Sequence, residues 1–327
     1  MEKLPIEIKS KKMLNRLIIK ARDFCNISCV PDGLTDILMV YSKTGDVPEQ
    51  LKYSKKLSYD YDYFIFAKST KSLLAIRQLL NSQELIFSED CFMLIRSIFE
   101  NHILSRYVRD NIDDEEKRKD VVDNFILAPL GISFGYYESR GKKGVFSQNN
   151  EKVGDIKNPR RVIMGNERDY YDLLYPFLCQ YTHCSYGALS CYFSQGNFTF
   201  GCQNFFLLTY LLAIFVFSKV YEGVVTVNGE DLVDTKTMKS YYNIAYDSLE
   251  LQMELIDYLI IYFRSKPKEI VNIVIEKYLG IGEFDNSNLK IVHMLEKMKE
   301  SLFDNAIGSL DKSEFIGEHF IRKYQEW

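Results

Sequence analysis

Apolar and polar positions recur with helical spacing over much of the chain. Between residues 57 and 81 the apolar side chains return every three or four positions, as they do on one face of a helix. The segment 88–109 has the same pattern, and Ser88 is a residue type that caps helix N-termini. Because a short link joins these segments, we expect two antiparallel helices that pack side by side.

Similar patterns, separated by Pro, Gly and Asn signals, predict helices elsewhere. Their expected ranges are 8–25, 34–42, 111–130, 167–193, 202–222, 238–264, 267–279 and 289–303. A small strand and turn are expected at 224–229, where β-branched residues precede Asn-Gly. Strand signals are otherwise sparse. The expected fold is therefore an all-α helical bundle.

One stretch requires a test for membrane spanning. Residues 184–218 carry no charged side chain, and 205–217 are apolar apart from Thr209. This apolar run is shorter than the ~20 residues that cross a bilayer. We expect a helix buried in the core, no membrane partner and, since the N-terminus has no apolar signal segment, a cytoplasmic protein. A membrane-associated toxin that uses 202–221 is a weaker alternative.

Residues 131–167 lack periodicity and are rich in glycine, so we expect a long inserted loop. The loop is basic and contains aromatic residues (Tyr136, Tyr137 and Phe146). Its cations are Arg140, Lys142, Lys143, Lys152, Lys157, Arg160 and Arg161. Phosphate-neutralising charges beside stacking rings suit single-stranded RNA or DNA. A solvated loop without a ligand is an equal alternative.

Charge, cysteine spacing and the motifs present limit the functions that the sequence can support. The chain has 327 residues and a formal net charge of -4, so nucleic-acid contact must come from a local patch of this kind. Seven cysteines with irregular spacing indicate free thiols rather than a disulfide framework. Motifs for phosphate-binding loops and dinucleotides are absent from the sequence, and we expect no cofactor and no metal.

The first candidate site lies on the expected helix 88–109. Arg96 could hold a scissile phosphate, and His102 could move protons at the 2′-OH of RNA or at the leaving oxygen, without a metal. Glu100, one turn from Arg96, could orient it. Arg96 and His102 are about 120° apart around the helix, so another helix or a second subunit would have to complete the site.

The same residues have a structural interpretation. His102 falls within the apolar stripe of its helix, where a histidine is commonly a hydrogen-bonded core residue. Arg96 and Glu100 have the spacing of an intrahelical ion pair.

A second candidate lies at 175–185. Tyr175, Cys179 and His183 are four residues apart and share a helix face. Cys179 and His183 have the spacing of two zinc ligands or of a Cys–His nucleophile pair, with Cys184, Cys191 and Cys202 as further candidate ligands. We favour a third interpretation, in which His183 hydrogen-bonds in the same polar pocket as Arg96 and Glu100 or simply caps the packing there.

These segments resemble a known family. The Lys-Ser helix around 67–76, the Arg-Ser-x-x-Glu helix at 96–100 and the later His183 are similar to a bacterial family of unknown function. That family in turn resembles the helical HEPN superfamily, which includes abortive-infection proteins and toxin ribonucleases. Nucleases of this superfamily carry an arginine, four to six residues and a histidine, and they usually act as homodimers. Arg96 and His102 match that spacing.

The resemblance implies a metal-independent endoribonuclease in anti-phage defence or a toxin system. Arg96 would bind phosphate, Glu100 would position it, and His102 or else His183 would act as acid and base. Tyr181, Lys142, Lys143, Arg160 and Arg161 would hold RNA. The implied organisation is an N-terminal extension (1–56), a HEPN-like core (57–232) with the basic loop, and C-terminal helices (233–327).

The competing function is a non-catalytic helical sensor or adaptor of a defence system. It would bind a nucleotide or a phage protein, with a partner protein of the same system. In that case Arg96, Glu100 and His183 form an internally satisfied polar network that fixes helix packing.

Overall fold

Long helices make up most of the part of the chain that the structure describes, which confirms the all-α class. The structure is a computed structural model. It describes residues 5–82, 86–127, 137–138, 145–146, 151–154, 159–163, 167–182, 188, 192–194, 197–200, 205–228, 235–266, 277–278 and 287–310.

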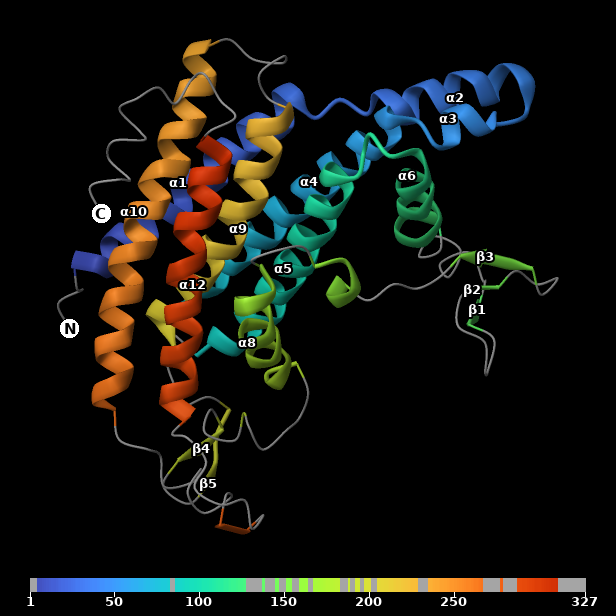
Figure 1. Cartoon of the computed structure of the whole chain (residues 1–327). Helices are drawn as coiled ribbons and strands as arrows, with labels where there is room; N and C mark the ends of the chain where they lie inside the picture. The colour runs from blue at the N-terminus through green and yellow to red at the C-terminus, as the bar shows by residue number, and fades with distance from the viewer. Residues whose placement is uncertain are drawn as a thin grey trace.

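The helices follow one another as shown in Figure 1. The first half contains α1 (Pro5–Ser28), α2 (Asp32–Thr44), α3 (Glu49–Lys52), α4 (Lys55–Leu80), α5 (Ser88–Asp110) and α6 (Glu115–Val121), which continues as the π-helix η1 (Val122–Leu127). The second half contains a 3-10 turn, η2 (Pro159–Val162), and the helices α8 (Glu167–Gln180), α9 (Phe206–Asn228), α10 (Thr235–Ser265) and α12 (Ser287–Leu310).

The expected antiparallel pair is confirmed. Helices α4 and α5 pack along each other, joined by the short link 81–87. The hydroxyl of Ser54 accepts a hydrogen bond from the backbone N–H of Leu57 and caps α4. In α5 the cap position belongs to Phe87, one residue before the Ser88 that the sequence suggested.

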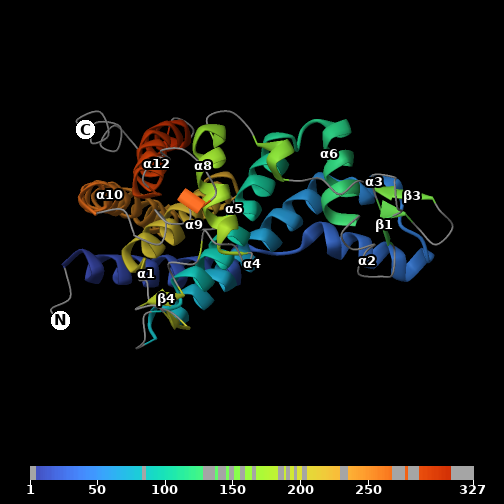
Figure 2. The same ribbon diagram turned by 90° about the horizontal axis from the view of Figure 1, so that it is seen from below.

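Helix α9 is the centre of the bundle and is surrounded by α1, α4, α5 and α10 (Figure 2). Among the described residues, the stretch Phe206–Val225 is long and apolar enough to cross a membrane. However, 89% of an apolar 18-residue segment within it is buried inside the protein. Its apolar side chains pack against those of the surrounding helices in one continuous core. The apolar run is therefore a core helix, as expected.

In the second half of the chain, two elements differ from those expected from the sequence. The strand expected at 224–229 is wrong, because α9 continues through Asn228. Val224 and Val225 are buried there, and tertiary packing outweighs their β-propensity. The helix expected at 167–193 ends at Gln180. The helix expected at 267–279 falls almost entirely outside the described residues.

The described parts of 131–167 contain short antiparallel strands, which the sequence did not predict. Strands β1 (Tyr137–Glu138), β2 (Val145–Phe146) and β3 (Lys152–Gly154) pair in that order, with a register shift between β2 and β3. A second pair is formed by β4 (Phe193–Ser194) and β5 (Asn197–Phe198).

Helices α2 and α3 project from the bundle beside the N-terminal end of α4 (Figure 1). Gly33 makes this contact possible, because a Cβ at that position would lie 2.4 Å from the backbone nitrogen of Leu57. The carboxylate of Asp60 on α4 accepts a 2.6 Å hydrogen bond from the backbone N–H of Leu34. The start of α2 is thus fixed directly to α4.

Candidate functional site

Helix α5 carries the first candidate residues, and the structure places Arg96 against the C-terminal half of α8. Its Nε donates to Glu100 at 3.1 Å, and its two terminal nitrogens donate to the hydroxyls of Tyr175 (2.9 Å) and Thr182 (3.3 Å). The Tyr175 hydroxyl in turn donates to Glu100 at 3.0 Å. We call these residues the Arg96 cluster: Arg96, Glu100, Tyr175 and Thr182. Every nitrogen of the guanidinium therefore has an internal acceptor.

The Arg96 cluster is half-buried, with 23% of the Arg96 side chain and 30% of the Glu100 side chain exposed. The guanidinium carbon lies 5.0 Å from the centre of the Tyr175 ring, which stacks on Tyr171 at 4.9 Å. Burial alone would lower the pKa of Arg96, but the bond to Tyr175 and the charge of Glu100 outweigh it and raise the pKa. Burial and Glu100 together raise the pKa of Tyr175 to about 12. The guanidinium of Arg96 and the hydroxyl of Tyr175 therefore both keep their protons at neutral pH.

His102 occupies a different and fully enclosed site. Its Nε2 donates to the Oε1 of Glu167 at 2.6 Å, and Arg106 pairs with the same carboxylate at 2.8 Å. Only 5% of the His102 side chain and 2% of the Glu167 side chain are exposed. We call His102, Arg106 and Glu167 the His102 cluster. The buried Nδ1 of His102 has no hydrogen-bond partner among the described residues, which favours the neutral imidazole.

Burial and charged neighbours together determine the protonation of the His102 cluster. Burial lowers the pKa of His102, against the attraction of Glu167. Burial alone would raise the pKa of Glu167, but its contacts with His102 and Arg106 hold it well below its usual range. The ammonium of Lys219 on α9 lies over the rings of Tyr170 (5.1 Å) and Phe215 (4.7 Å). Burial lowers its pKa to about 8.

The two clusters do not converge on one ligand. Both join α5 to α8, but Glu167 is the first residue of α8 and Tyr175 lies eight residues further on. At 1.5 Å per residue these partners are about 12 Å apart along the helix axis. Arg96 and His102 therefore contact different parts of α8, and they do not meet in one site within the described residues of this chain.

A third polar group joins α5 to α4 and α9. The buried carboxylate of Asp62 accepts a hydrogen bond from Ser105 and lies 3.8 Å from the guanidinium of Arg109. Burial raises the pKa of Asp62, although Arg109 and Ser105 oppose the shift. Gly223 of α9 makes room for Arg109, because a Cβ there would lie 1.9 Å from a terminal guanidinium nitrogen.

The other predicted residues are placed as follows. Tyr181 packs its half-buried ring on Phe92, with 4.9 Å between centroids. Arg161 belongs to η2 and is exposed, and the backbone of Arg160 belongs to the same turn. Lys142, Lys143, the side chain of Arg160 and His183 lie outside the described residues. Within the described residues, no three His, Cys, Asp or Glu side chains are grouped as metal ligands would be.

Sequence reasoning missed Glu167 and Lys219, and it did not connect Tyr175 to Arg96. The sequence signal that could have indicated Glu167 is the spacing of His102 and Arg106, which are one turn apart near an apolar helix face. Such a pair of proton donors at a buried position requires an acidic partner from another element.

A groove follows the seam between α1 and α10. It encloses about 740 Å³ over an apolar floor of Met13, Leu251 and Met253. Its α1 wall is basic and its α10 wall is acidic, with ion pairs from Lys9 to Glu254 (2.8 Å) and from Arg16 to Asp247 (2.7 Å).

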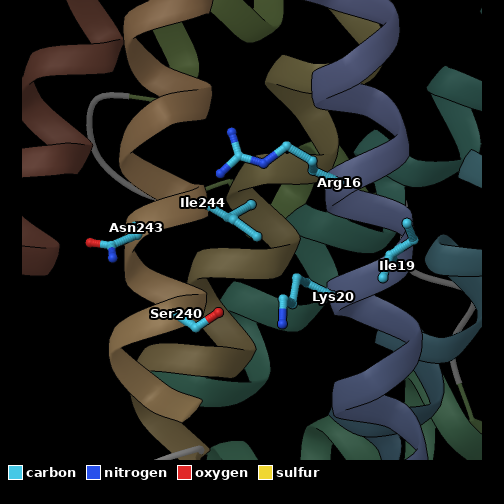
Figure 3. A pocket seen from close by; sticks show the side chains of 6 residues that line it. All are labelled: Arg16, Ile19, Lys20, Ser240, Asn243 and Ile244. Carbon is cyan, nitrogen blue, oxygen red and sulfur yellow. The ribbon is translucent and has the colours of Figure 1, made fainter. Parts of the chain in front are cut away.

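Along the same seam lies a smaller hollow of about 320 Å³. Figure 3 shows Arg16, Ile19 and Lys20 of α1 across from Ser240, Asn243 and Ile244 of α10. The hollowed surface therefore extends from Lys9 to Lys20 along α1.

Comparisons of the chain with family models, with curated proteins and with solved structures find no match.

Proposed function

We propose that this protein is a non-catalytic helical sensor or adaptor, of the kind used in bacterial defence, and that it works in the cytoplasm. The observation that carries the proposal is that Arg96 and His102 are both engaged by partners inside the protein, in different parts of α8. A general acid–base histidine must come within hydrogen-bond reach of the proton that it transfers. His102, enclosed beside Glu167, has no such access in this arrangement.

The Arg96 cluster supports the same proposal. A phosphate would have to compete with Glu100, which already neutralises the guanidinium at 3.1 Å. Displacing Glu100 would also break the hydrogen bond that Tyr175 donates to it. The cluster is therefore better suited to hold α8 on α5 than to receive an anion.

The groove between α1 and α10 is the surface that we propose for a partner. Its cations Lys9 and Arg16 are already paired with Glu254 and Asp247, so a phosphate, and hence a nucleotide, would have to displace these carboxylates. A protein segment with both charge signs and an apolar face complements the two walls and the floor. Of the two expected ligand classes, the groove favours the protein.

An RNA-cleavage assay tests the proposal. We expect purified wild-type protein to leave a mixed single-stranded RNA intact, in the presence or absence of a chelator. If RNA is cleaved, the comparison of Arg96→Ala with Arg22→Ala shows whether the cleavage depends on Arg96. Arg22→Ala is the control, because Arg22 is an exposed arginine on α1. Cleavage that is lost in the folded Arg96→Ala protein and kept in Arg22→Ala would contradict a non-catalytic function.

One observation favours the endoribonuclease as a second candidate. Thr182, which accepts a hydrogen bond from Arg96, directly precedes His183 in the sequence. An active site of Arg96 and His183 would not need His102. In that case His183→Ala abolishes RNA cleavage while His293→Ala, at an exposed histidine of α12, leaves it unchanged. Equal cleavage by both variants would reject this candidate.

A further inference from the structure

Two cysteines lie one helical turn apart at the C-terminal end of α1. Cys25 lies in the last turn of the helix and Cys29 directly follows it. Four residues of helix separate Cα atoms by about 6 Å, which lies within the range that a disulfide bridges. The two side chains are near enough that each shifts the pKa of the other, and neither sulfur is in a disulfide.

The surroundings of this pair leave it accessible. Both cysteines are half-buried, whereas Cys91 is fully buried. The neighbours of Cys29 in the sequence are open to solvent, with Ile27 57% and Val30 53% exposed. Because Cys29 lies beyond the regular helix, its sulfur can approach Cys25 without breaking a helical turn.

The pKa values of the two thiols are shifted in opposite directions. The hydrogen bond with Cys29 lowers the pKa of Cys25, against an opposing effect of burial. The pKa of Cys29 is raised by the same contact and by burial. Since the thiolate is the nucleophile, Cys25 is suited to attack first and Cys29 to react second.

We propose that Cys25 and Cys29 form a redox-active dithiol that a hydroperoxide converts to an intrachain disulfide. The Cys25 thiolate attacks one peroxide oxygen, the O–O bond breaks, and the other oxygen leaves as hydroxide or alkoxide and takes up a proton. The sulfur of Cys29 then displaces the hydroxyl of the resulting sulfenic acid, which leaves as water. In total, the two sulfurs give two electrons to the peroxide.

The position of the dithiol gives the disulfide a structural effect. Only Val30 and Pro31 separate Cys29 from α2, the helix that projects from the bundle in Figure 1. The disulfide would fix the chain at the point where α1 passes into α2. This inference is independent of the proposed function.

Peptide mapping of the full chain after peroxide treatment tests the proposal. Trypsin cleaves after Arg22 and Lys43, so both cysteines fall in the peptide 23–43. We expect this peptide to lose two hydrogen atoms, to resist alkylation and to recover both thiols after reduction. Cys91 should remain a thiol under the same conditions.

Two variants separate the roles of the cysteines. Cys29→Ser should stop the reaction at a sulfenic acid on Cys25, which dimedone traps, and Cys25→Ser should react slowly. Circular dichroism verifies that each variant is folded. The proposal is wrong if peptide 23–43 of the wild-type protein remains fully alkylated under excess hydrogen peroxide, or if Cys91 oxidises first.

Discussion

The imidazole of His102 and the carboxylate of Glu167 are joined by a 2.6 Å hydrogen bond in the protein interior. His102 belongs to α5, and Glu167 is the first residue of α8, 65 positions later in the chain. The acidic side chain at this helix start also interacts favourably with the helix dipole. The bond therefore fixes the N-terminal end of α8 to α5.

Removal of the Glu167 carboxylate should destabilise the fold. Glu167→Ala leaves His102 without its acceptor and removes one of the two carboxylates that pair with Arg106, the other being Asp110. Breaking a buried pair of this kind costs about 2–4 kcal/mol when one partner can still reach water. Arg106 is such a partner, since 30% of its side chain is exposed. Urea unfolding measures the loss.

The matched control for this prediction is Asp169→Ala, at an exposed acidic residue in the same turn of α8. It should change the free energy of unfolding by less than about 0.5 kcal/mol. Equal losses in the two variants would show that the Glu167 contacts do not stabilise the fold.

The His102 cluster also predicts a pH dependence of stability. Burial lowers the pKa of His102 in the folded protein, assisted by the nearby cations Lys219 and Arg109 and opposed by Glu167. In the unfolded chain a histidine titrates near its ordinary value of about 6.5. As the pH falls below that value, the unfolded chain binds a proton that the folded chain does not, so stability decreases.

Urea unfolding between about pH 5.5 and 7.5 tests this dependence in wild type and His102→Gln. The wild type should lose up to about 1.4 kcal/mol more per pH unit on acidification than the variant. Taking the difference reduces the contributions of other groups, such as Glu222, whose pKa is raised by burial to about 7. Parallel curves, or a wild type that gains stability in acid relative to the variant, would contradict a neutral buried His102.

Gly223 and Arg109 should be energetically coupled. A Cβ on Gly223 would displace the Arg109 guanidinium and leave the buried Asp62 without its nearest cation. We expect Gly223→Ala to cost about 2 kcal/mol or more in wild type and much less in an Arg109→Met background, where that guanidinium is absent. Urea unfolding of the four proteins gives the coupling energy. If the two changes are additive, Gly223 does not serve to admit Arg109.

Most of the fold could be predicted because its signals are local. The apolar period of 57–81 and 88–109 identifies α4 and α5 to within a few residues. The charge-free stretch around Thr209 identifies the core helix α9. The strand expected at 224–229 failed because burial against neighbouring helices, which no local pattern shows, decides the conformation there.

The candidate site could be predicted only in part. The Arg96–Glu100 ion pair follows from its spacing on one helix and is confirmed at 3.1 Å. Glu167 and Tyr175 are 65 and 79 positions away from the residues that they contact, His102 and Arg96. Such contacts depend on how α8 lies on α5, which periodicity does not specify. His102 belongs to the core, as its place in the apolar stripe indicated, and it does not lie beside Arg96.

The melting temperature of Arg96→Ala tests most directly whether the polar residues of α5 hold the fold together. Loss of the guanidinium leaves Glu100, Tyr175 and Thr182 without their common donor, so we predict a melting temperature about 2–4 °C below wild type. Arg22→Ala should melt within about 1 °C of wild type. An Arg96→Ala protein that melts at or above the wild-type temperature would contradict the account, since residues placed for chemistry are commonly neutral or costly for stability.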